Sequence, residues 1–222
     1  MKVGAESDRK WMQLALTLAR RGEGLTRPNP PVGAVVVKNG RKIGQGWHQK
    51  AGGPHAEVFA LRQAGKAARG ATLYVTLEPC STFGRTPPCT DAILRAGIAR
   101  VVAAVADPNP RHAGRGLRRL RRAGIRVDAG VCAEDAGRLI APFACRMVKH
   151  RPFISLKLGL SLDGRIADHT HSSRWITGPE AREEVQALRR TADAIMVGAG
   201  TVRRDNPSLW PRPDGKRNPW RV

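Results

Sequence analysis

Apolar residues near the start of the chain recur at helical spacing, and short β-branched runs follow them. The helical pattern covers residues 7–21 and predicts an amphipathic helix. Two apolar runs, residues 32–37 and 42–47, flank an Asn-Gly pair that is typical of a tight turn. They predict a β-hairpin that ends at His48. Three prolines exclude both helix and central strand from the segment between these elements, so we expect a loop that presents Asn29.

Strands and helices alternate after this hairpin. A Gly-Gly-Pro break predicts a helix over residues 54–67, with Pro54 in the first turn, where its missing N–H costs least. The same criteria predict strands at 71–77, 101–106 and 125–129 and helices at 88–96 and 114–123. This alternation indicates an α/β fold with three layers, α/β/α, in a domain that covers residues 1–149.

Residues 150–222 show a weaker version of the same pattern. Residues 153–160 alternate as a strand, residues 179–190 have helical spacing, and residues 194–197 form another apolar strand. The last five residues resemble the start of a strand. Two strands and one helix leave open sheet edges and little core, so we expect residues 150–222 to be the incomplete N-terminal part of a second α/β domain.

The net charge of +21 raises the question of an anionic partner. Of the 39 basic residues 30 are arginine, and they are densest between Arg111 and Arg126. Two interpretations stay open for this basic segment: a solvated helix face or a phosphate contact. Aromatic residues make up only 5% of the chain and do not alternate with the basic residues, so the stacking platform of a single-strand binder is missing. Nucleic acid is therefore not the expected partner.

The apolar runs and the cysteines indicate which cellular compartment to expect. No apolar run approaches the roughly 20 residues of a membrane span, and the N-terminus lacks the apolar segment of a signal peptide. Four cysteines, two of them in Pro-Cys pairs nine positions apart, fit metal binding in a reducing compartment better than a disulfide framework. We expect a cytoplasmic protein with no membrane partner.

Candidate chemistry is concentrated between Gly52 and Cys89. His55, Cys80 and Cys89 offer one imidazole and two thiolates, the set with which catalytic zinc sites leave a fourth position open. Glu57 is a nearby carboxylate that could move a proton between water and a leaving nitrogen. The His-x-Glu and Pro-Cys elements match the signature of zinc deaminases, although the second cysteine lies much further along than in the usual Cys-x-x-Cys spacing.

With these motifs the chain resembles the bacterial bifunctional riboflavin-biosynthesis family, in which a diaminohydroxyphosphoribosylaminopyrimidine deaminase is fused to a 5-amino-6-(5-phosphoribosylamino)uracil reductase. The motifs that carry the resemblance are Pro28-Asn29-Pro30, Pro54-His55-Ala56-Glu57, Thr76-Leu77-Glu78-Pro79-Cys80-Ser81, Gly84-Arg85-Thr86-Pro87-Pro88-Cys89 and Asp107-Pro108-Asn109-Pro110. The resemblance implies a cytidine-deaminase-like domain with a mixed five-stranded sheet, followed by the start of a dihydrofolate-reductase-like α/β domain.

The resemblance also implies roles for residues of the first domain. His55, Cys80 and Cys89 would bind Zn²⁺, and Glu57 would be the catalytic proton carrier. The implied contacts with the ribose, base or phosphate of the substrate, a phosphoribosylaminopyrimidine, are Asn29, His48 and Arg85. One position departs from the family pattern, because Thr82 stands where the family usually has histidine. That departure bears on substrate affinity and leaves the zinc ligands intact.

In residues 150–222 the resemblance is to the first third of the family's reductase, where NADPH and the ribosyl substrate bind. The matching residues are Lys157, Gly159, Asp163, Ser173, Trp175, Arg189, Thr201, Asp205, Leu209 and Arg212. Because most of that domain has no counterpart here, we expect a reductase remnant and NADPH binding only if the domain is completed.

Two other functions stay open from the sequence. The chain could deaminate tRNA or single-stranded nucleic acid, which the charge favours and the cysteine spacing disfavours. It could also be a non-catalytic binding module stabilised by zinc, with His48 as the nearest candidate for a fourth ligand. We further expect a homo-oligomer.

Overall fold

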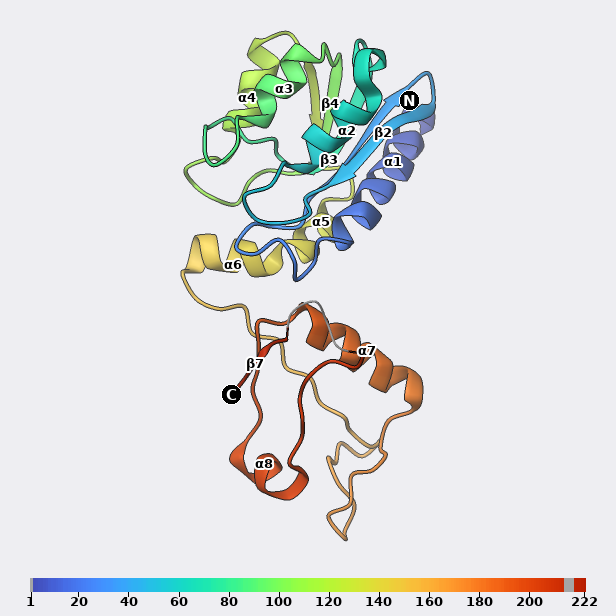
Figure 1. Cartoon of the computed structure of the whole chain (residues 1–222). Coiled ribbons are helices and arrows are strands. Elements are labelled where there is room, and N and C mark those ends of the chain that lie inside the picture. The colour runs from blue at the N-terminus through green and yellow to red at the C-terminus, as the bar shows by residue number, and fades with distance from the viewer. Residues whose placement is uncertain (1, 214–217) are drawn as a thin grey trace. The chain divides into compact units, whose positions relative to one another are not determined.

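The chain divides into two structural units. A computed structural model describes residues 2–213 and 218–222 and separates Met1–Phe153 (unit 1) from Ile154–Val222 (unit 2) (Figure 1). The elements of unit 1 are α1 (Lys2–Arg20), β1 (Gly33–Lys38), β2 (Arg41–Trp47), α2 (Ala56–Ala64), a 3₁₀ turn (Gly65–Ala68), β3 (Thr72–Leu77), α3 (Cys89–Arg95), β4 (Arg100–Val105), α4 (Arg115–Arg122), β5 (Arg126–Ala129), α5 (Ala133–Leu139) and α6 (Ala141–Lys149).

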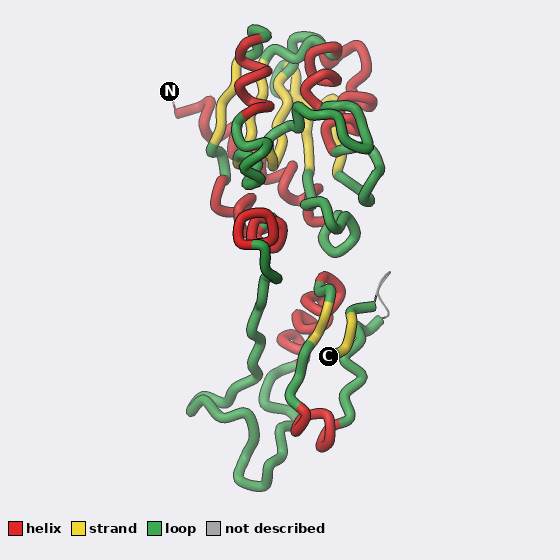
Figure 2. Tube along the Cα trace, turned by 90° about the vertical axis from the view of Figure 1, so that its left-hand side faces the viewer, coloured by secondary structure: helices red, strands yellow, loops and turns green. Residues whose placement is uncertain are grey.

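Unit 1 is built on a mixed five-stranded sheet with the order β2-β1-β3-β4-β5. Strand β1 runs antiparallel to β2 and β3, whereas β3, β4 and β5 are parallel. The strands lie side by side with helices on both sides (Figure 2). The expected hairpin and the expected mixed sheet are therefore confirmed.

Alternating side chains of the strands build two separate apolar layers. Val36, Leu73 and Val101 point to the side that α2, α3 and α4 cover. Their neighbours Val35 and Val102 point to the opposite side, which α1 and α5 cover. Because successive residues of a strand face opposite sides of a sheet, a continuous apolar run such as that of β1 can serve both layers. The result is the α/β/α arrangement that the sequence predicted.

Helix α2 lies very close to β2 and begins later than expected. A Cβ atom placed on Gly44 would come within 2.2 Å of the Ala60 carbonyl oxygen, so only glycine permits this approach. The helix predicted over 54–67 is present, but the placement of Pro54 in its first turn is wrong. The helix begins at Ala56, His55 is its N-cap, and a 3₁₀ turn follows its last residue. Pro54 instead belongs to the preceding loop, and His55 lies at the helix start with an extended backbone.

A buried polar network joins α1 to three strands of the sheet. The carboxylate of Asp8 accepts hydrogen bonds from the Tyr74 hydroxyl at 2.7 Å and from two guanidinium nitrogens of Arg100 at 2.8 and 2.7 Å. Arg100 Nε also donates to Asp128 at 2.6 Å. Burial would raise the pKa of Asp8, but the hydrogen bonds from Arg100 and Tyr74 outweigh it, and that pKa is lowered. The network thus ties α1 to β3, β4 and β5.

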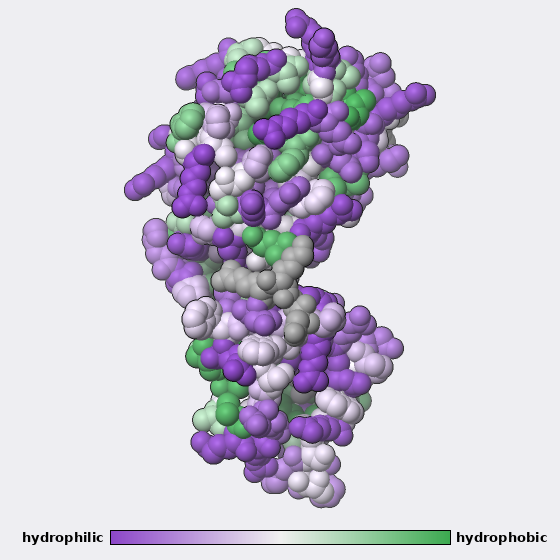
Figure 3. Space-filling view, viewed as in Figure 1, coloured by the Kyte–Doolittle hydropathy of each residue, from purple (hydrophilic) through white to green (hydrophobic). Residues whose placement is uncertain are grey.

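Unit 2 has less regular structure than unit 1. Its elements are α7 (Pro179–Thr191), β6 (Ala194–Ile195), α8 (Ala199–Asp205) and β7 (Trp220–Arg221), and β6 and β7 form a parallel pair. Strand β7 confirms the expectation of a strand near residue 220. Many large apolar side chains of this unit are exposed, among them Ile154, Leu162 and Met196, and apolar surface is visible on the unit in Figure 3.

The prediction of a strand over residues 153–160 is wrong. These residues have no strand assignment and form no ladder with another described segment. Leu156 is 84% exposed and Leu158 is 55% exposed. Alternation marks a segment that could pair, but a strand exists only when a neighbour accepts and donates its backbone hydrogen bonds.

The sequence pattern also missed α5, α6 and α8, which are short helices of seven to nine residues. Within the described ranges, no helix combines the length and the apolar character that crossing a lipid bilayer requires.

Candidate active site

The three expected metal ligands come from different elements and meet at one end of the sheet. Cys80 follows β3 after Glu78 and Pro79, Cys89 is the first residue of α3, and His55 is the N-cap of α2. Their ligand atoms all lie within 4.8 Å of one another. Residues at the carboxyl ends of parallel strands and at helix starts are well placed for such convergence, because the chain turns there toward the same edge of the sheet.

The contacts within this cluster suit a metal ion. His55 Nδ1 lies 3.2 Å from Cys89 Sγ and 3.5 Å from Cys80 Sγ, and the Cys89 backbone N–H donates to Cys80 Sγ at 3.3 Å. One imidazole and two thiolates form a donor set that zinc prefers, and three protein ligands leave room for a fourth. The backbone N–H also stabilises negative charge on Cys80, so the residues present fit a zinc ion.

Electrostatics within the cluster favour one thiolate. The hydrogen bond from Cys89 and the contact with His55 together lower the pKa of Cys80 to about 4, against the effect of burial. The pKa of Cys89 is raised, because Cys89 shares its proton with Cys80 and is itself buried. The Cys80 hydrogen bond raises the pKa of His55. The cluster therefore holds negative charge that a divalent cation would neutralise.

Glu57 lies in the first turn of α2, two residues after His55. Its side chain is almost fully buried, 3% exposed, and within the described residues its Oε2 atom has no hydrogen-bond partner. Burial raises the pKa of Glu57 to about 7, and the charge of Cys80 adds to this shift. A buried carboxyl group with a free oxygen and a pKa near neutrality has the properties of a group that accepts and returns a proton.

Buried His48 and half-buried Asn29 form a hydrogen-bonded pair beside the cluster. His48 Nδ1 lies 3.0 Å from the Pro54 carbonyl oxygen, which can only accept, so Nδ1 carries the proton. Nε2 then accepts from the Asn29 amide at 3.0 Å. Burial lowers the pKa of His48, in agreement with a neutral ring. With both nitrogens occupied, His48 is a poor fourth ligand, although its ring centroid is 5.2 Å from that of His55.

Glu78 organises the loop beside the cluster, a role that the sequence reasoning missed. Its buried carboxylate accepts four backbone N–H groups, from Asp107 at 3.0 Å, Gly114 at 2.8 Å, Gly116 at 2.8 Å and Leu117 at 3.3 Å. A Cβ atom on Gly116 would lie 2.0 Å from the Pro79 carbonyl oxygen, so the backbones touch there. A glutamate next to the Pro-Cys pair at the end of a buried strand was the available signal.

The remaining predicted residues of the first domain lie on exposed loops. Arg85 is exposed in the segment between Cys80 and Cys89, and a Cβ atom placed on Gly52 would lie 3.7 Å from its Cδ and Nη1 atoms. Thr82 in the same segment has its hydroxyl oxygen 3.4 Å from Nδ1 of His112. The loops that carry Gly52, Arg85 and His112 therefore approach one another near the cluster.

The structure brings only a few of the predicted reductase residues together. Arg189 and Arg212 are close enough to interact electrostatically. Burial and the positive charge of Arg212 lower the pKa of Arg189. A Cβ atom on Gly159 would lie 3.5 Å from Lys157 Nζ. Trp175 packs against the guanidinium of Arg182, 4.5 Å from the ring centroid. The others, namely Asp163, Ser173, Thr201, Asp205 and Leu209, are spread over loops and α8.

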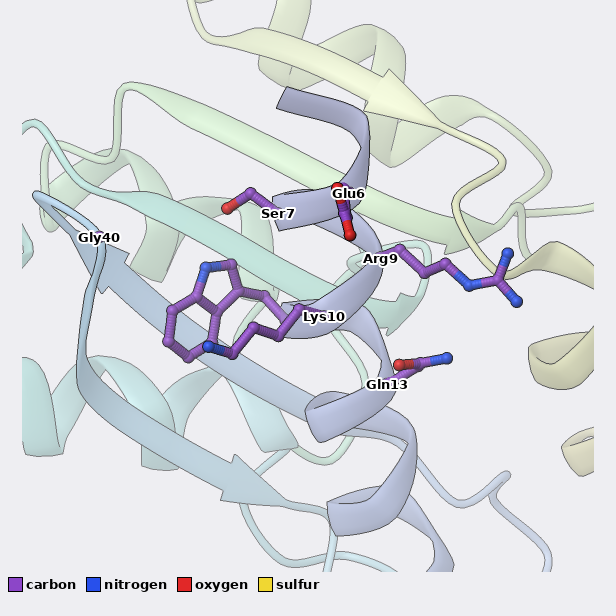
Figure 4. A pocket seen from close by; sticks show the side chains of 7 residues that line it. Glu6, Ser7, Arg9, Lys10, Gln13 and Gly40 are labelled. Carbon is purple, nitrogen blue, oxygen red and sulfur yellow. The ribbon is translucent and has the colours of Figure 1, made fainter. Parts of the chain in front are cut away.

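A hollow of the surface lies away from the cluster of metal ligands. It measures about 600 Å³ and is lined by residues of α1 and by the hairpin turn, with the Lys10 ammonium over the Trp11 ring (Figure 4). Helix α1 packs on the other side of the sheet from α2. This hollow shares no residue with the cluster, and its lining lacks a set of metal-binding or nucleophilic groups. The chemistry points to the cluster.

Comparisons with known proteins agree with this geometry. Residues 5–105 match the family described as "Cytidine and deoxycytidylate deaminase zinc-binding region", and residues 152–222 match "RibD C-terminal domain". The chain is 57% identical over 204 residues to "Riboflavin biosynthesis protein RibD" of Aquifex aeolicus, and 55% identical over 202 residues to that of Escherichia coli. These alignments cover 92% and 91% of this chain but only 57% and 55% of the relatives.

A solved structure shows the same relation. The Thermotoga maritima diaminohydroxyphosphoribosylaminopyrimidine deaminase / 5-amino-6-(5-phosphoribosylamino)uracil reductase superposes with a TM-score of 0.91 at 48% identity, over 99% of this chain and 63% of that one. Fold and site together define an α/β protein of the zinc-binding deaminase class. Within this class, the chain belongs to the RibD family of riboflavin-biosynthesis proteins. It spans somewhat more than half the length of the curated relatives.

Proposed function

We propose that unit 1 is a zinc-dependent aminohydrolase that deaminates 2,5-diamino-6-(5-phosphoribosylamino)pyrimidin-4-one in riboflavin biosynthesis. The observation that carries this proposal is the buried Glu57, whose free oxygen lies beside three converging metal ligands, His55, Cys80 and Cys89. Similarity to RibD proteins supports the choice of substrate. The catalytic domain would cover residues 1–149.

In this proposal the chain's own residues divide the work of a hydrolytic deamination. Zinc, when bound by the three ligands, supplies Lewis-acid activation of the attacking water. Glu57 takes a proton from that water as a C–O bond forms at the amine-bearing ring carbon. When the C–N bond breaks, Glu57 returns the proton to the departing ammonia. The pKa of about 7 supports both roles, because the carboxyl group can exist in either state near neutral pH.

We assign substrate contacts to Asn29, His48 and Arg85. Asn29 uses an N–H to hold His48, which leaves its carbonyl oxygen and its second N–H for a ligand. Neutral His48 would orient Asn29 and contribute its own ring surface. Arg85, exposed in the loop between the two cysteines, is suited to the substrate phosphate because a guanidinium can bind phosphate through two N–H groups.

For residues 150–222 we propose the N-terminal part of a reductase domain. The match to the RibD C-terminal domain and the paired cations Arg189 and Arg212 support an anionic ligand such as NADPH. The exposed apolar side chains and the two-stranded sheet support the view that this domain binds NADPH only when completed. The same exposed surface supports a homo-oligomer, and four free cysteines support a cytoplasmic location.

A nucleic-acid deaminase is the second candidate function. Helix α4 favours it, because five of its eight residues are arginines and most of them are exposed. The observations against it are the long spacing between Cys80 and Cys89 and the small share of aromatic residues.

One experiment separates these functions. Zinc content would be measured together with ammonia release from the phosphoribosylaminopyrimidine and from a tRNA hairpin. We expect one zinc per chain and ammonia from the pyrimidine only. Glu57→Gln should keep the zinc and slow release by roughly 10² to 10⁴-fold. Zinc without ammonia from either substrate would favour a non-catalytic module, and wild-type rates in Glu57→Gln would exclude the proposed role of Glu57.

A further inference from the structure

Two loops meet beside the metal cluster, and each contributes one side chain to their contact. The first loop joins Cys80 to Cys89 and carries Thr82. The second follows β4 and carries His112, whose Nδ1 lies 3.4 Å from the Thr82 hydroxyl oxygen. Thr82 is two residues from a metal ligand, so this contact stands at the rim of the site. His112 has no role in the function proposed above.

Both loops are held in place by groups other than the side chains of Thr82 and His112. Glu78 fixes the His112 loop through the backbone N–H groups of Asp107 and Gly114. The His112 backbone N–H also donates to the Asn109 carbonyl at 2.8 Å. Arg119 of α4 reaches the other loop, with Nη1 3.4 Å from the Ser81 carbonyl oxygen and Nη2 2.6 Å from Asp91. The imidazole is therefore presented by a fixed backbone, which is what a binding group requires.

The hydrogen-bonding state of His112 leaves one ring nitrogen available. When the Thr82 hydroxyl donates to Nδ1, the neutral ring carries its proton on Nε2. No described residue forms a hydrogen bond with Nε2. Half-buried His112 can thus offer an N–H donor at the rim of the site.

The charges around His112 favour an anionic partner for that donor. Arg111 and Arg115, from the same loop and the start of α4, are exposed. The nearby carboxylates are already engaged: Glu78 by four backbone N–H groups, Asp91 by Arg119, and Asp107 by the Asn109 N–H at 2.8 Å. Asp107 is itself half-buried, and burial raises its pKa. Asp107 and His112 also interact electrostatically, but among the described residues of this rim the exposed Arg111 and Arg115 leave an excess of positive charge.

We infer that His112, oriented by Thr82, is a substrate-binding residue that recognises the phosphate group of the substrate. This inference rests on the proposed function and adds a second phosphate contact on the side of the site formed by the β4–α4 loop. It also gives Thr82 a function: its hydroxyl contacts Nδ1 and orients the His112 ring.

Binding of ribose 5-phosphate to the zinc-loaded full chain tests the inference without any deamination. Calorimetry would compare the wild type with His112→Gln and Thr82→Val, with Thr82→Ser as the conservative variant and His169→Gln as a matched control on an exposed loop of unit 2. We expect roughly 10-fold weaker binding in the first two variants, because His112→Gln loses the imidazole that contacts the phosphate and Thr82→Val loses the hydroxyl that orients this imidazole. Thr82→Ser and His169→Gln should bind as the wild type does, and zinc content should be equal in all.

Ribose without phosphate and steady-state kinetics complete the test. With the phosphorylated pyrimidine, His112→Gln should raise KM and leave kcat unchanged, and with the dephosphorylated nucleoside it should match the wild type. The inference is wrong if the wild type does not bind ribose 5-phosphate, if His112→Gln binds it normally, or if the variant weakens ribose equally. A wild type that binds ribose 5-phosphate through His112 but releases no ammonia would contradict the proposed function alone.

Discussion

Strand β3 in unit 1 and residues 154–160 in unit 2 have similar alternating apolar patterns, but only β3 is a strand. Leu73 of β3 is 0% exposed and lies between two hydrogen-bonded neighbours, β1 and β4. Leu156 is 84% exposed in a segment without a ladder among the described residues. The contrast teaches that alternation selects which side chains share a face, whereas burial depends on a partner strand and a covering helix.

The same contrast decides where chemistry is organised. In unit 1 every ligand of the candidate metal centre begins or follows an element that packs on the sheet, so the donor atoms converge. In unit 2 the predicted binding residues lie mainly on loops, and few of them contact one another. Precise placement of functional groups requires rigid supporting elements.

We expect the largest effect from removing a zinc ligand, which should change unit 1 and leave unit 2 unchanged. Cys89→Ala should weaken zinc binding by more than about 100-fold, since even the loss of a partner behind a ligand costs 10 to 100-fold. Ammonia release should disappear. Hydrogen exchange should rise around His55 and Cys80 in unit 1 and stay unchanged in unit 2. Cys145→Ala is the control, and faster exchange in both units would mean that they do not respond independently.

Leucine truncation tests the packing side of the comparison. Leu73→Ala should lower the free energy of unfolding by about 2 to 5 kcal/mol, because it leaves a cavity in a fully buried layer. Leu156→Ala should change it by less than about 0.5 kcal/mol, as is usual for exposed side chains. Urea unfolding monitored by circular dichroism measures both. A large loss in Leu156→Ala would show that residues 153–160 are buried in solution.

The pH dependence of the metal-free protein tests the cost of burying Glu57. The pKa of Glu57 is about 7 in the folded protein and 4.5 when unperturbed, so the folded state binds more protons between these values. Stability should therefore fall as pH rises from 4.5 to 7. At pH 8 the free energy of unfolding of Glu57→Gln, measured by urea denaturation, should exceed that of the wild type by roughly 2 to 4 kcal/mol, at about 1.4 kcal/mol per pKa unit. At pH 4 the difference should vanish.

The smallest effect compares two ion pairs within unit 1. Asp8→Asn should cost about 1 to 3 kcal/mol, because it weakens the buried network with Tyr74 and Arg100. The exposed pair Glu134–Arg138 is the control, and Glu134→Gln should cost less than about 1 kcal/mol. Since the pKa of Asp8 is lowered, its contribution is present above pH 3.8 and is lost as pH falls through its value in the folded protein. Equal costs in both variants would contradict the structural role of the Asp8 network.

Local patterns in the sequence predicted the hairpin, ligand chemistry predicted the convergence of His55, Cys80 and Cys89, and the family resemblance implied the mixed sheet. The sequence could not predict that Glu78 binds four backbone N–H groups, since that depends on where residues 107–117 pass in space. It also placed the start of α2 two residues too early. Proline tolerates both a first helical turn and an extended loop, and only tertiary packing decides between them.

The use of backbone groups to bind Glu78 has an evolutionary consequence. A loop anchored through its main chain keeps its path when its side chains change, provided that Gly116 still clears Pro79. The side chains of Asp107 and Asn109 accept backbone hydrogen bonds within the loop, but residues 111–113 can acquire new side chains by single substitutions while the neighbouring metal ligands remain undisturbed. Selection on substrate preference can act on this segment independently of selection on the reaction itself, which makes it the natural place to look for adaptation among relatives.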